Sequence, residues 1–575
     1  MRMDRIVSAL SLFCLAGTVI AEPPAALDRV PKGAVVAVGV RSVSDSMAKI
    51  EKYAAAFGLP TGPLVQMSTL TDAEGFHKAG SAAFAMLGDP TSPDFSPDTS
   101  GFVIVSVSDF SKFVSFYGGK IEDKQSTLPK LSEDAIARDI GGGFVAVGPA
   151  PAIKAFVTVE GQMAAHKAAL GTAGNRIADQ ADILVISNLE SFSSEMLSGV
   201  EELKGTLDMV GQMAAAENPE AEKSFAAMGK VMEQFAQDVR TGIMGMSVND
   251  AGISIDFAAQ FKDGSGMHKQ MQHEGKAGQS AAGLPAMPFL LAGGIDMTCP
   301  AIRDAVAAMS AMQQGMGLNI GKGMEKIEGQ SFMIGANPAL LSTGIFARTV
   351  INTRTSDPAA VVAAQREAIE GMAKTGAESG VKYDLKYTPE ATEIAGVKVD
   401  RWKAKIDIDP DSPAAQMQQV MAIFTGSSGE MGGMSAKTKN SVVSTMSVNT
   451  EMMTKAIDAA NGKGALSGDT GFAAVAAQLP SGRTGEMYLG VKGIFDTVKG
   501  AASSFNADIP FNISEELPPI GMAITTDGGG MSFRIHAPSK VVDAIAKIVK
   551  EMNTPVEGDA PAPEQNEGER RKPRF

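Results

Sequence analysis

One plan recurs along this chain: an apolar run typical of a strand, a polar capping residue, and a segment whose apolar side chains follow helical spacing. In its first occurrence the apolar run covers 34–40, Ser44 supplies a cap, and a helical segment at 45–57 ends before Gly58. An element of either kind must bury its apolar face against another element. We therefore expect helices packed on a sheet.

The units come in the same order in the two halves of the chain. An apolar run and a capped helix at 101–109 have a counterpart at 344–358, and a hairpin at 242–261 has a counterpart at 521–535. In each hairpin two apolar runs flank a turn that contains Asp and Gly. The order predicts a tandem duplication. The alternative is an α+β chain that alternates such segments without a common origin of its halves.

The duplication defines the predicted domains. A first α+β half covers 22–275 and a second covers 285–552, with a Gly- and Ala-rich stretch at 262–288 suited to a linker. Because of the hairpins, we predict that each half is a mainly antiparallel or mixed sheet with helices on one face. A ferredoxin-like split βαβ grouping fits the order best. Surface loops are predicted at 89–101 and 425–440, which are rich in Pro, Ser, Gly or Met.

The segment 27–33, Leu-Asp-Arg-Val-Pro-Lys-Gly, stands directly before the first apolar run. Together with the strand, the capped helix and the two-fold repetition that follow, it resembles secreted bacterial envelope proteins known only as domains of unknown function, of a tandem α+β repeat type. The resemblance implies a signal peptide followed by a Leu and Pro element and an extended apolar strand. It covers the overall plan and implies no catalytic residue.

Both ends of the chain are predicted to lie outside the fold. Residues 1–21 combine an early basic residue, Arg2, with an apolar run and small residues before a cleavage site after Ala21. This is the anatomy of a cleavable signal peptide, and it predicts a secreted or periplasmic protein with no stable membrane span. The alternative is an amino-terminal membrane anchor. The tail at 553–575, rich in Pro, Glu and Gly, is predicted to be disordered.

Removal of the signal peptide would leave Cys299 as the only thiol. No intramolecular disulfide can then form, so a large core must stabilise the protein. Cys299 precedes an amphipathic segment and has no basic partner nearby in the sequence, and we interpret it as a small buried hydrophobic residue. Methionine is abundant, with 34 residues against a single Trp402, which indicates an aliphatic, methionine-rich core.

The net charge argues against nucleic acid as a partner. The chain carries a formal charge of −14 at pH 7, whereas a protein that binds phosphate backbones needs a basic face. The basic cluster at 570–574 lies in a tail that also carries several glutamates.

The search for catalytic or metal-binding motifs predicts no site residue: no catalytic, cofactor-binding or metal-ligating side chain is assigned. His268 and His273 stand five residues apart, on different faces of any helix, so they do not form a metal pair. The glycines of 317–323 resemble a phosphate loop, but the spacing is one residue short and no Ser or Thr follows Lys322. No Gly-x-Ser-x-Gly element occurs.

Alternating carboxylates at Asp407, Asp409 and Asp411 start like a calcium-binding loop, but Ser412 stands where such a loop needs glycine. Charged and apolar residues alternate at 403–409, which favours a half-buried strand with a charged outer face. We predict a strand there and no calcium site.

The segment 191–240 carries two apolar stripes at helical spacing, broken near Asn218 and Pro219. The stripes contain Leu203, Leu207, Val210, Met213, Phe225, Met228, Met232 and Phe235. We expect both to pack on the sheet of their own half, and the alternative is a projecting helical hairpin.

These observations predict a non-catalytic binding or scaffold protein of the envelope, whose partner is an unknown envelope protein or an apolar ligand. A hydrolase with a dispersed active site is the first alternative, because such a site needs no contiguous motif. Copper binding through methionine thioethers, at closely spaced pairs such as Met244 and Met246, is the second.

Overall fold

The computed structural model describes most of the chain. The described residues are 22–57, 71–92, 95–157, 161–215, 219–315, 324–375, 381–408, 426, 430–507, 513 and 516–553. The predicted signal peptide at 1–21, almost all of the predicted tail and the glycine-rich stretch 317–323 lie outside these residues.

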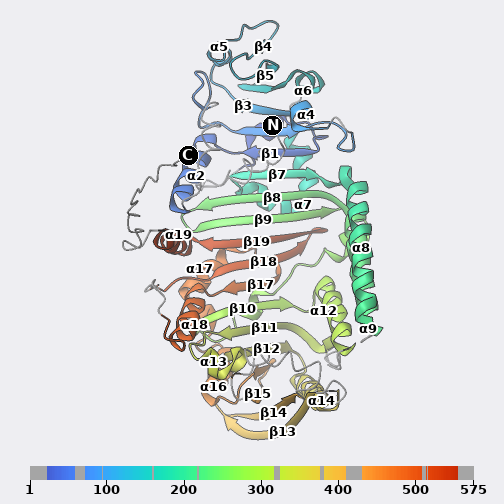
Figure 1. The fold of residues 1–575 in the computed structure, drawn as a ribbon, viewed down its shortest axis with the longest axis vertical. Coiled ribbons are helices and arrows are strands. Elements are labelled where there is room, and N and C mark those ends of the chain that lie inside the picture. The colour runs from blue at the N-terminus through green and yellow to red at the C-terminus, as the bar shows by residue number, and fades with distance from the viewer. Residues whose placement is uncertain are drawn as a thin grey trace, which may run out of the picture.

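The strands of the described residues form one continuous sheet of 19 strands (Figure 1). The order across the sheet is β4-β5-β6-β3-β2-β1-β7-β8-β9-β19-β18-β17-β10-β11-β12-β16-β15-β14-β13. All of these pairings are antiparallel. The structure is therefore α+β with a large antiparallel sheet.

The strand bounds are as follows, in chain order. The strands before residue 262 are β1 (Val36–Val40), β2 (Ala82–Met86), β3 (Gly101–Ser106), β4 (Gln125–Thr127), β5 (Ala135–Gly141), β6 (Phe144–Pro149), β7 (Ile183–Asn188), β8 (Val239–Asn249) and β9 (Gly252–Phe261). Those after it are β10 (Phe289–Asp296), β11 (Ile327–Gly335), β12 (Thr349–Thr355), β13 (Val381–Ile394), β14 (Val397–Ile408), β15 (Glu430–Lys437), β16 (Ser441–Thr445), β17 (Arg483–Leu489), β18 (Ile520–Asp527) and β19 (Gly530–Pro538).

Helices connect and cover the strands. In the first half they are η1 (Ala25–Arg29), α2 (Val43–Phe57), α4 (Pro97–Ser100), α5 (Phe110–Phe116), α6 (Ala150–Ala155), α7 (Met163–Gln180), η2 (Leu189–Phe192), α8 (Ser193–Ala215) and α9 (Pro219–Asp238). After β9 follow α10 (Gly266–Gln270), α11 (Gly278–Ala281), α12 (Pro300–Gly315), η3 (Met324–Lys326), α13 (Leu340–Thr343), η4 (Ile345–Arg348), α14 (Pro358–Thr375), α16 (Thr450–Ala460), η7 (Leu466–Gly468), α17 (Thr470–Gln478), α18 (Val491–Ser503) and α19 (Ser539–Asn553).

The central pair of the sheet joins the last strand of each predicted half. Strand β9 pairs with β19 over nine residues, from Gly252 opposite Pro538 to Gln260 opposite Gly530. Counted outward from this pair, one side runs 9-8-7-1-2-3-6-5-4 and the other runs 19-18-17-10-11-12-16-15-14-13. The sheet is thus shared by the two predicted halves.

The predicted ferredoxin-like grouping is not confirmed. A split βαβ unit holds its two helix-linked strands parallel with another strand between them, whereas β1 and β2, linked by α2, pair directly and antiparallel. The predicted linker at 262–288 is also more ordered than expected. It contains α10 and α11, and Met267, Ala281 and Leu284 in it are buried in the core.

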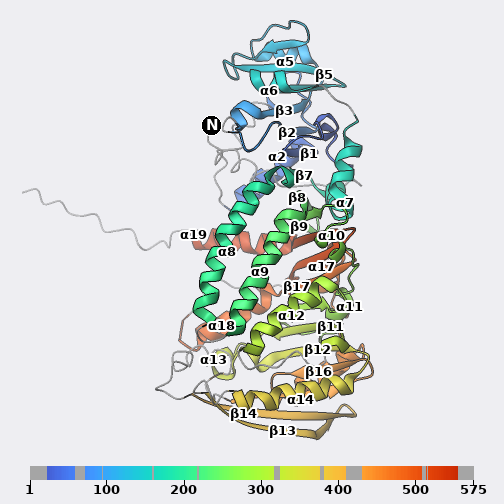
Figure 2. The same ribbon diagram turned by 90° about the vertical axis from the view of Figure 1, so that its right-hand side faces the viewer.

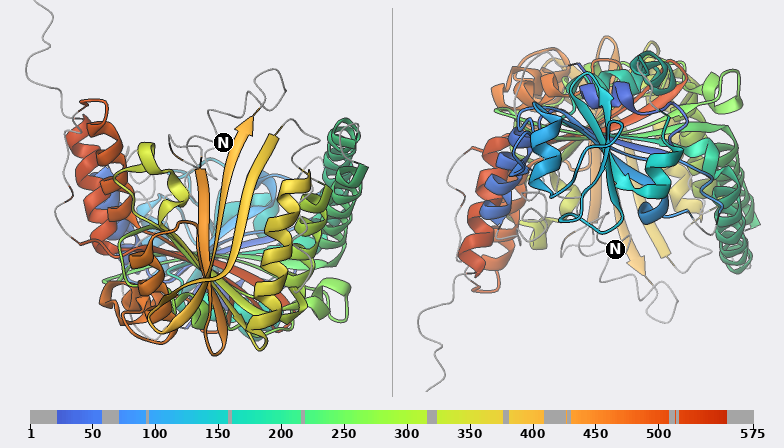
Figure 3. Two further views of the ribbon diagram at one scale, coloured as in Figure 1. Left: turned by 90° about the horizontal axis from the view of Figure 1, so that it is seen from below. Right: turned by 90° about the horizontal axis from the view of Figure 1, so that it is seen from above.

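Helices cover both faces of the sheet, which corrects the prediction of a single covered face (Figure 3). Side chains alternate along β1, so Ala37 faces a core formed with α7, whereas Val38 faces a core that includes Val542 of α19. Each side of the strand is apolar, and each therefore needs a cover.

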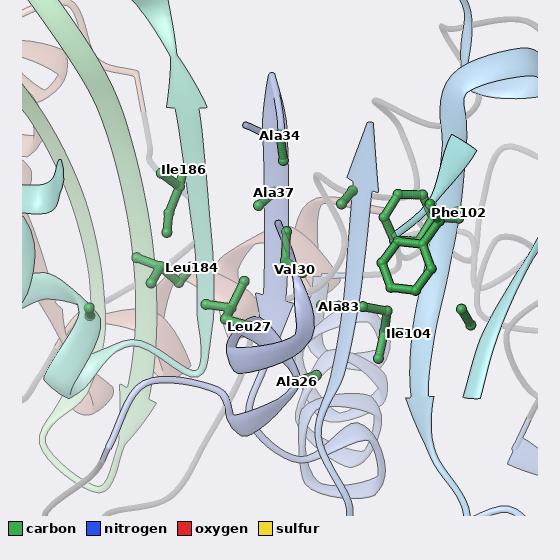
Figure 4. Close-up of a cluster of buried hydrophobic side chains, with 14 of the residues drawn as sticks. Ala26, Leu27, Val30, Ala34, Ala37, Ala83, Phe102, Ile104, Leu184 and Ile186 are labelled. Atoms are coloured by element: carbon green, nitrogen blue, oxygen red, sulfur yellow. The ribbon is translucent and has the colours of Figure 1, made fainter. Parts of the chain in front are cut away.

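A short helix before the first strand completes one of these cores. Leu27 of η1 is fully buried over β1, where a side chain at Gly39 would collide with it at 2.8 Å (Figure 4). The Leu and Pro element at the start of the chain thus packs on the sheet.

Three further expectations have an outcome. The segment 430–437, predicted to be a loop, is strand β15, because it pairs with β14 and β16. The strand predicted at 403–409 is confirmed up to Ile408 by β14, and Asp409 and Asp411 lie outside the described residues. Residues 89–101 contain the short helix α4 among turns.

Helices α8 and α9 form a long hairpin beside the sheet (Figure 2). At its base, Met196 and Phe235 pack against Phe261 of their own half, as predicted. Beyond the base, α9 packs on α12 of the second half, and Leu203 and Met228 are exposed. The prediction that both stripes pack on their own sheet is therefore wrong for the outer part of the hairpin.

Two glycines on the strands that flank the central pair allow helices to approach the sheet. A side chain on Gly245 of β8 would meet Ile177 of α7, and one on Gly521 of β18 would meet Val475 of α17. In both cases the helix lies so close that only hydrogen fits on the strand.

We expect Gly245→Ala to destabilise the protein by about 1–3 kcal/mol, because the added methyl would lie 2.2 Å from Ile177 Cγ2 in a packed core. Gly33→Ala is the matched control, since no atom lies within 4 Å of the added methyl. Chemical denaturation of both variants measures the difference. Equal stability of the two variants would contradict this packing.

Candidate functional site

The two central strands place their polar side chains under the helices and their apolar side chains on the opposite face. On one face Ser254, Asp256, Gln260, Ser532, Arg534 and His536 are all buried. On the other face β9 and β19 carry only apolar residues: Ile253, Ile255, Phe257, Ala259, Met531, Phe533, Ile535 and Ala537. Sheets usually bury the apolar side and expose the polar one. Here that arrangement is inverted.

Asp256 and Arg534 form the centre of the buried polar side. They are direct partners in the β9–β19 ladder, and their side chains pair through Nε to Oδ1 at 2.6 Å and Nη2 to Oδ2 at 3.0 Å. Both side chains are only 6% exposed. Arg534 also donates to the Gln478 carbonyl at the end of α17 and to Gln180 Oε1 at the end of α7. One guanidinium thus connects two helices and two strands.

Further polar contacts continue this layer across the same junction. Arg176 of α7 donates to Asp527, Thr525 and Ser532 of the second half. Ser254 Oγ lies 2.9 Å from His536 Nδ1, again between directly paired residues. Buried polar groups cost free energy unless they are hydrogen-bonded, and most of these groups are. Asp527 Oδ1 and Gln260 Oε1 are buried in the layer without a hydrogen-bond partner.

Burial changes the protonation of two groups in the layer. It raises the pKa of Asp256 above its ordinary value, although Arg534 acts in the opposite direction. Burial, together with the smaller effect of the nearby Arg534 charge, lowers the pKa of His536 to about 4. His536 is therefore neutral at pH 7.

A polar pocket of about 820 Å³ opens beside this layer, between the ends of α7 and α17. Charges of both signs line it: Glu22, Arg41, Arg176, Asp179, Asp182 and Arg534. Most of these charges already have partners, since Arg534 binds Asp256 and Arg41 donates to the Ala178 and Ala181 carbonyls at the end of α7. No histidine is among the lining residues, so the pocket lacks the usual general base.

The opposite side of the junction is an apolar surface, here called the central apolar face. It consists of two cross-strand rows, Met244–Phe257–Phe533–Ile524 and Met246–Ile255–Ile535–Met522–Met487. Phe257 is 44% exposed and Ile524 is 36% exposed, and the other members are half-buried. An exposed apolar surface of this kind marks a binding site more often than a scattered exposed residue does.

Helices bound the central apolar face at both ends of the strands. At one end Val542 of α19 packs in a core with Ile253 and Ala537. At the other end Phe235 of α9 packs in a core with Ala259 and Met531. The two rows between these helices are partly open, and Met246 at the end of the longer row also packs against the core that contains Val542.

Helix α8, the partner of α9 in the hairpin, carries an apolar stripe of its own. Leu203 and Val210 follow Met196 at steps of seven residues, so the three lie on one face of the helix. Met196 packs in the core, whereas Leu203 and Val210 are exposed. Leu203 and Val210 therefore extend the apolar stripe of α8 beyond the core at the base of the hairpin.

The residues singled out from the sequence lie elsewhere. Cys299 is fully buried, as predicted, with Sγ 3.7 Å from Thr526 Oγ1. His268 lies at the Gln272 side chain, whereas His273 binds Asp296, so the two histidines have different partners. Within the described residues, no group of three or more His, Cys, Asp or Glu side chains could hold a metal ion.

His273, Asp296 and Thr298 form the arrangement closest to a hydrolase site. His273 Nε2 lies 3.2 Å from Asp296 Oδ2, and the Thr298 hydroxyl donates to Asp296 Oδ1 at 2.6 Å. In a catalytic triad the histidine stands between hydroxyl and carboxylate and uses a different ring nitrogen for each. Here the hydroxyl binds the carboxylate directly, and Nε2 faces both groups. This geometry is that of a structural hydrogen-bond network.

The methionine pair considered for copper binding lies among apolar side chains. Met244 and Met246 lie in the two rows of the central apolar face, next to Phe257 and Ile255. Met434 is fully buried in the second-half core.

Comparison with known proteins adds no relative: no family model, no curated protein and no solved structure matches this chain. No helix of the described residues is long and apolar enough to cross a membrane.

We expect the stability of the protein to fall as the pH is lowered from about 6.5 to about 4. The unfolded chain takes up a proton on His536 in this range, near the ordinary pKa of 6.5, whereas the folded chain keeps the ring neutral until about pH 4. The loss attributable to this group is about 3 kcal/mol, at 1.36 kcal/mol for each unit of pKa.

The matched variant is His536→Asn, which keeps a polar side chain beside Ser254 but does not titrate. Chemical denaturation of both proteins at several pH values in this range measures the difference, because all other groups titrate in both. An identical pH dependence would contradict the neutral, buried state of His536.

Proposed function

We propose that this chain is an exported, non-catalytic binding protein whose central apolar face binds an apolar ligand. The observation that carries the proposal is the inversion of the central strands, which bury Asp256 and Arg534 and leave Phe257 and Phe533 on the open side. Leaving that side in water costs about 25 cal/mol for each Å² of apolar surface. A ligand that covers it recovers this free energy.

The polar chemistry of the molecule supports binding over catalysis. The charged groups at the junction are paired with one another, and the His273 network does not have the geometry of a triad. The pockets of about 820, 300 and 200 Å³ have no histidine in their walls. A hydrolase would need a base beside an open nucleophile.

We further propose that the two halves arose by duplication and now form one body. Asp256 is the fifth residue of β9 and Arg534 is the fifth residue of β19, and the two are direct partners. A two-fold axis that exchanges the two strands would pass between them. The similar strand order on the two sides, with one extra strand on the side of β19, supports this proposal.

Export is a proposal from the sequence, since the signal-like segment 1–21 lies outside the described residues. The buried Cys299 would be shielded from oxidation at an extracytoplasmic location. Cell fractionation with mass measurement of the mature chain tests both the location and the cleavage after Ala21.

We expect Phe257→Asp to weaken binding of an uncharged apolar fluorophore such as N-phenyl-1-naphthylamine at least roughly tenfold. The substitution removes apolar contact area and places a charge that a bound ligand would desolvate. Fluorescence titration of the full mature chain measures the dissociation constant.

Phe116→Asp is the matched control, because Phe116 is 40% exposed, close to the 44% of Phe257, but belongs to α5 near the β4 edge of the sheet. The control should bind the fluorophore like the unmodified protein. Equal affinities of all three proteins, with both variants folded by denaturation, would reject the central apolar face as the binding site.

A further inference from the structure

We infer that the ligand of the central apolar face is a single flexible acyl chain that lies across the strands, along the long axis of the sheet. This inference rests on the proposed function and names the ligand class. Four properties of the face support it: the length of its rows, the width between its walls, its twist and its area.

The rows have the length of one lipid chain. The longer row crosses five strands, from Met246 on β8 to Met487 on β17. Neighbouring strands lie about 4.8 Å apart, so this row is about 19 Å long. One leaflet of a bilayer is about half of its hydrocarbon core, or about 15 Å. An extended acyl chain of a membrane lipid therefore matches the row.

The open width suits one chain. The two rows are separated by two residues along each strand, for example Ile255 and Phe257, which is about 7 Å. Beyond them the strands are covered by α19 at Ile253 and by α9 at Ala259. A hydrocarbon chain that lies along and between the rows would contact both rows at once.

The twist of the sheet favours a flexible ligand. Adjacent strands rotate by about 20–25°, so a row across five strands turns by roughly 80–100°. A chain with free rotation about its bonds follows such a turn, and each methylene keeps its contacts. A rigid, flat ring system of the same area would touch the middle of the row and leave its ends uncovered.

The area is too small for a stable protein interface. Each open position covers about 4.8 Å by about 7 Å, so the nine residues of the two rows present roughly 300 Å². A stable protein partner or a second copy of this chain needs about 800 Å² on each side. The nine positions carry no charged or polar side chain to orient a protein partner either.

The test is a displacement titration with the mature chain, in which saturated fatty acids of about eight to about sixteen carbons compete with bound N-phenyl-1-naphthylamine. We expect affinity to rise up to about fourfold for each added methylene, since each buried methylene contributes about 0.8 kcal/mol. The rise should end once the chain fills the row. A sterol of similar apolar area should compete more weakly than the longest fatty acid.

Met522→Asp and Ile535→Asp each interrupt the longer row and should remove the dependence on chain length for chains that reach beyond the substitution. The control variant Phe116→Asp should retain the dependence of affinity on chain length. An affinity that does not change with chain length, or a sterol that competes as well as the longest acid, would overturn the acyl chain while leaving the proposed apolar site in place. Failure of the fluorophore itself to bind at Phe257 would reject the site.

Discussion

The ion pair between Asp256 and Arg534 is the constraint on which the rest of the structure depends. It lies at the middle of the only strand pair that joins the two halves of the described sheet, and both side chains are buried. Two charges taken from water are tolerated only when each is paired and hydrogen-bonded, and Arg534 gains the ends of α7 and α17 as further partners. The pair therefore fixes the register of β9 on β19 and the position of both helices over it.

That register determines which side of the sheet is left open. Because side chains alternate along a strand, burying the charged positions of β9 and β19 puts Ile255, Phe257, Phe533 and Ile535 on the other face. Helices α19 and α9 cover the ends of this face but not its middle. The buried polar layer and the central apolar face are thus two consequences of one pairing.

Much of the architecture could be predicted from local sequence. The apolar runs and the helices with apolar stripes were placed correctly where spacing and caps agree, as in β1 and α19, and the two hairpins were found from their turn residues. The duplication inferred from the order of elements stays a prediction.

The central apolar face could not be predicted from the sequence. Alternating polar and apolar residues usually mark a strand whose polar side faces water, whereas here the polar side is buried. The alternation of Ile255, Asp256 and Phe257 is what an ordinary strand with a wet polar face shows. Asp256 can be buried because Arg534 pairs with it, and Arg534 lies on a strand some 280 residues away in the chain. Pairing over such a separation leaves no local pattern. The same reason explains why the predicted linker is packed, since Ala281 and Leu284 lie in a core with residues as far along the chain as Tyr488. The predicted loop that became β15 has its partners β14 and β16 nearby in sequence, and its Gly, Ser and Met content is what favoured a loop.

The most direct test of this account is the stability of the charge-swapped protein Asp256→Arg/Arg534→Asp, measured by chemical denaturation beside the two single variants. Each single variant puts like charges together at a buried position, and we predict a loss of about 3–5 kcal/mol or more. The double variant should recover part of that loss, because the two positions lie opposite each other and the opposite charges are again paired. The Gln478 carbonyl, which accepts from Arg534, would lose its donor. A double variant as unstable as the singles, or single variants as stable as the unmodified protein, would contradict the central role of this pair.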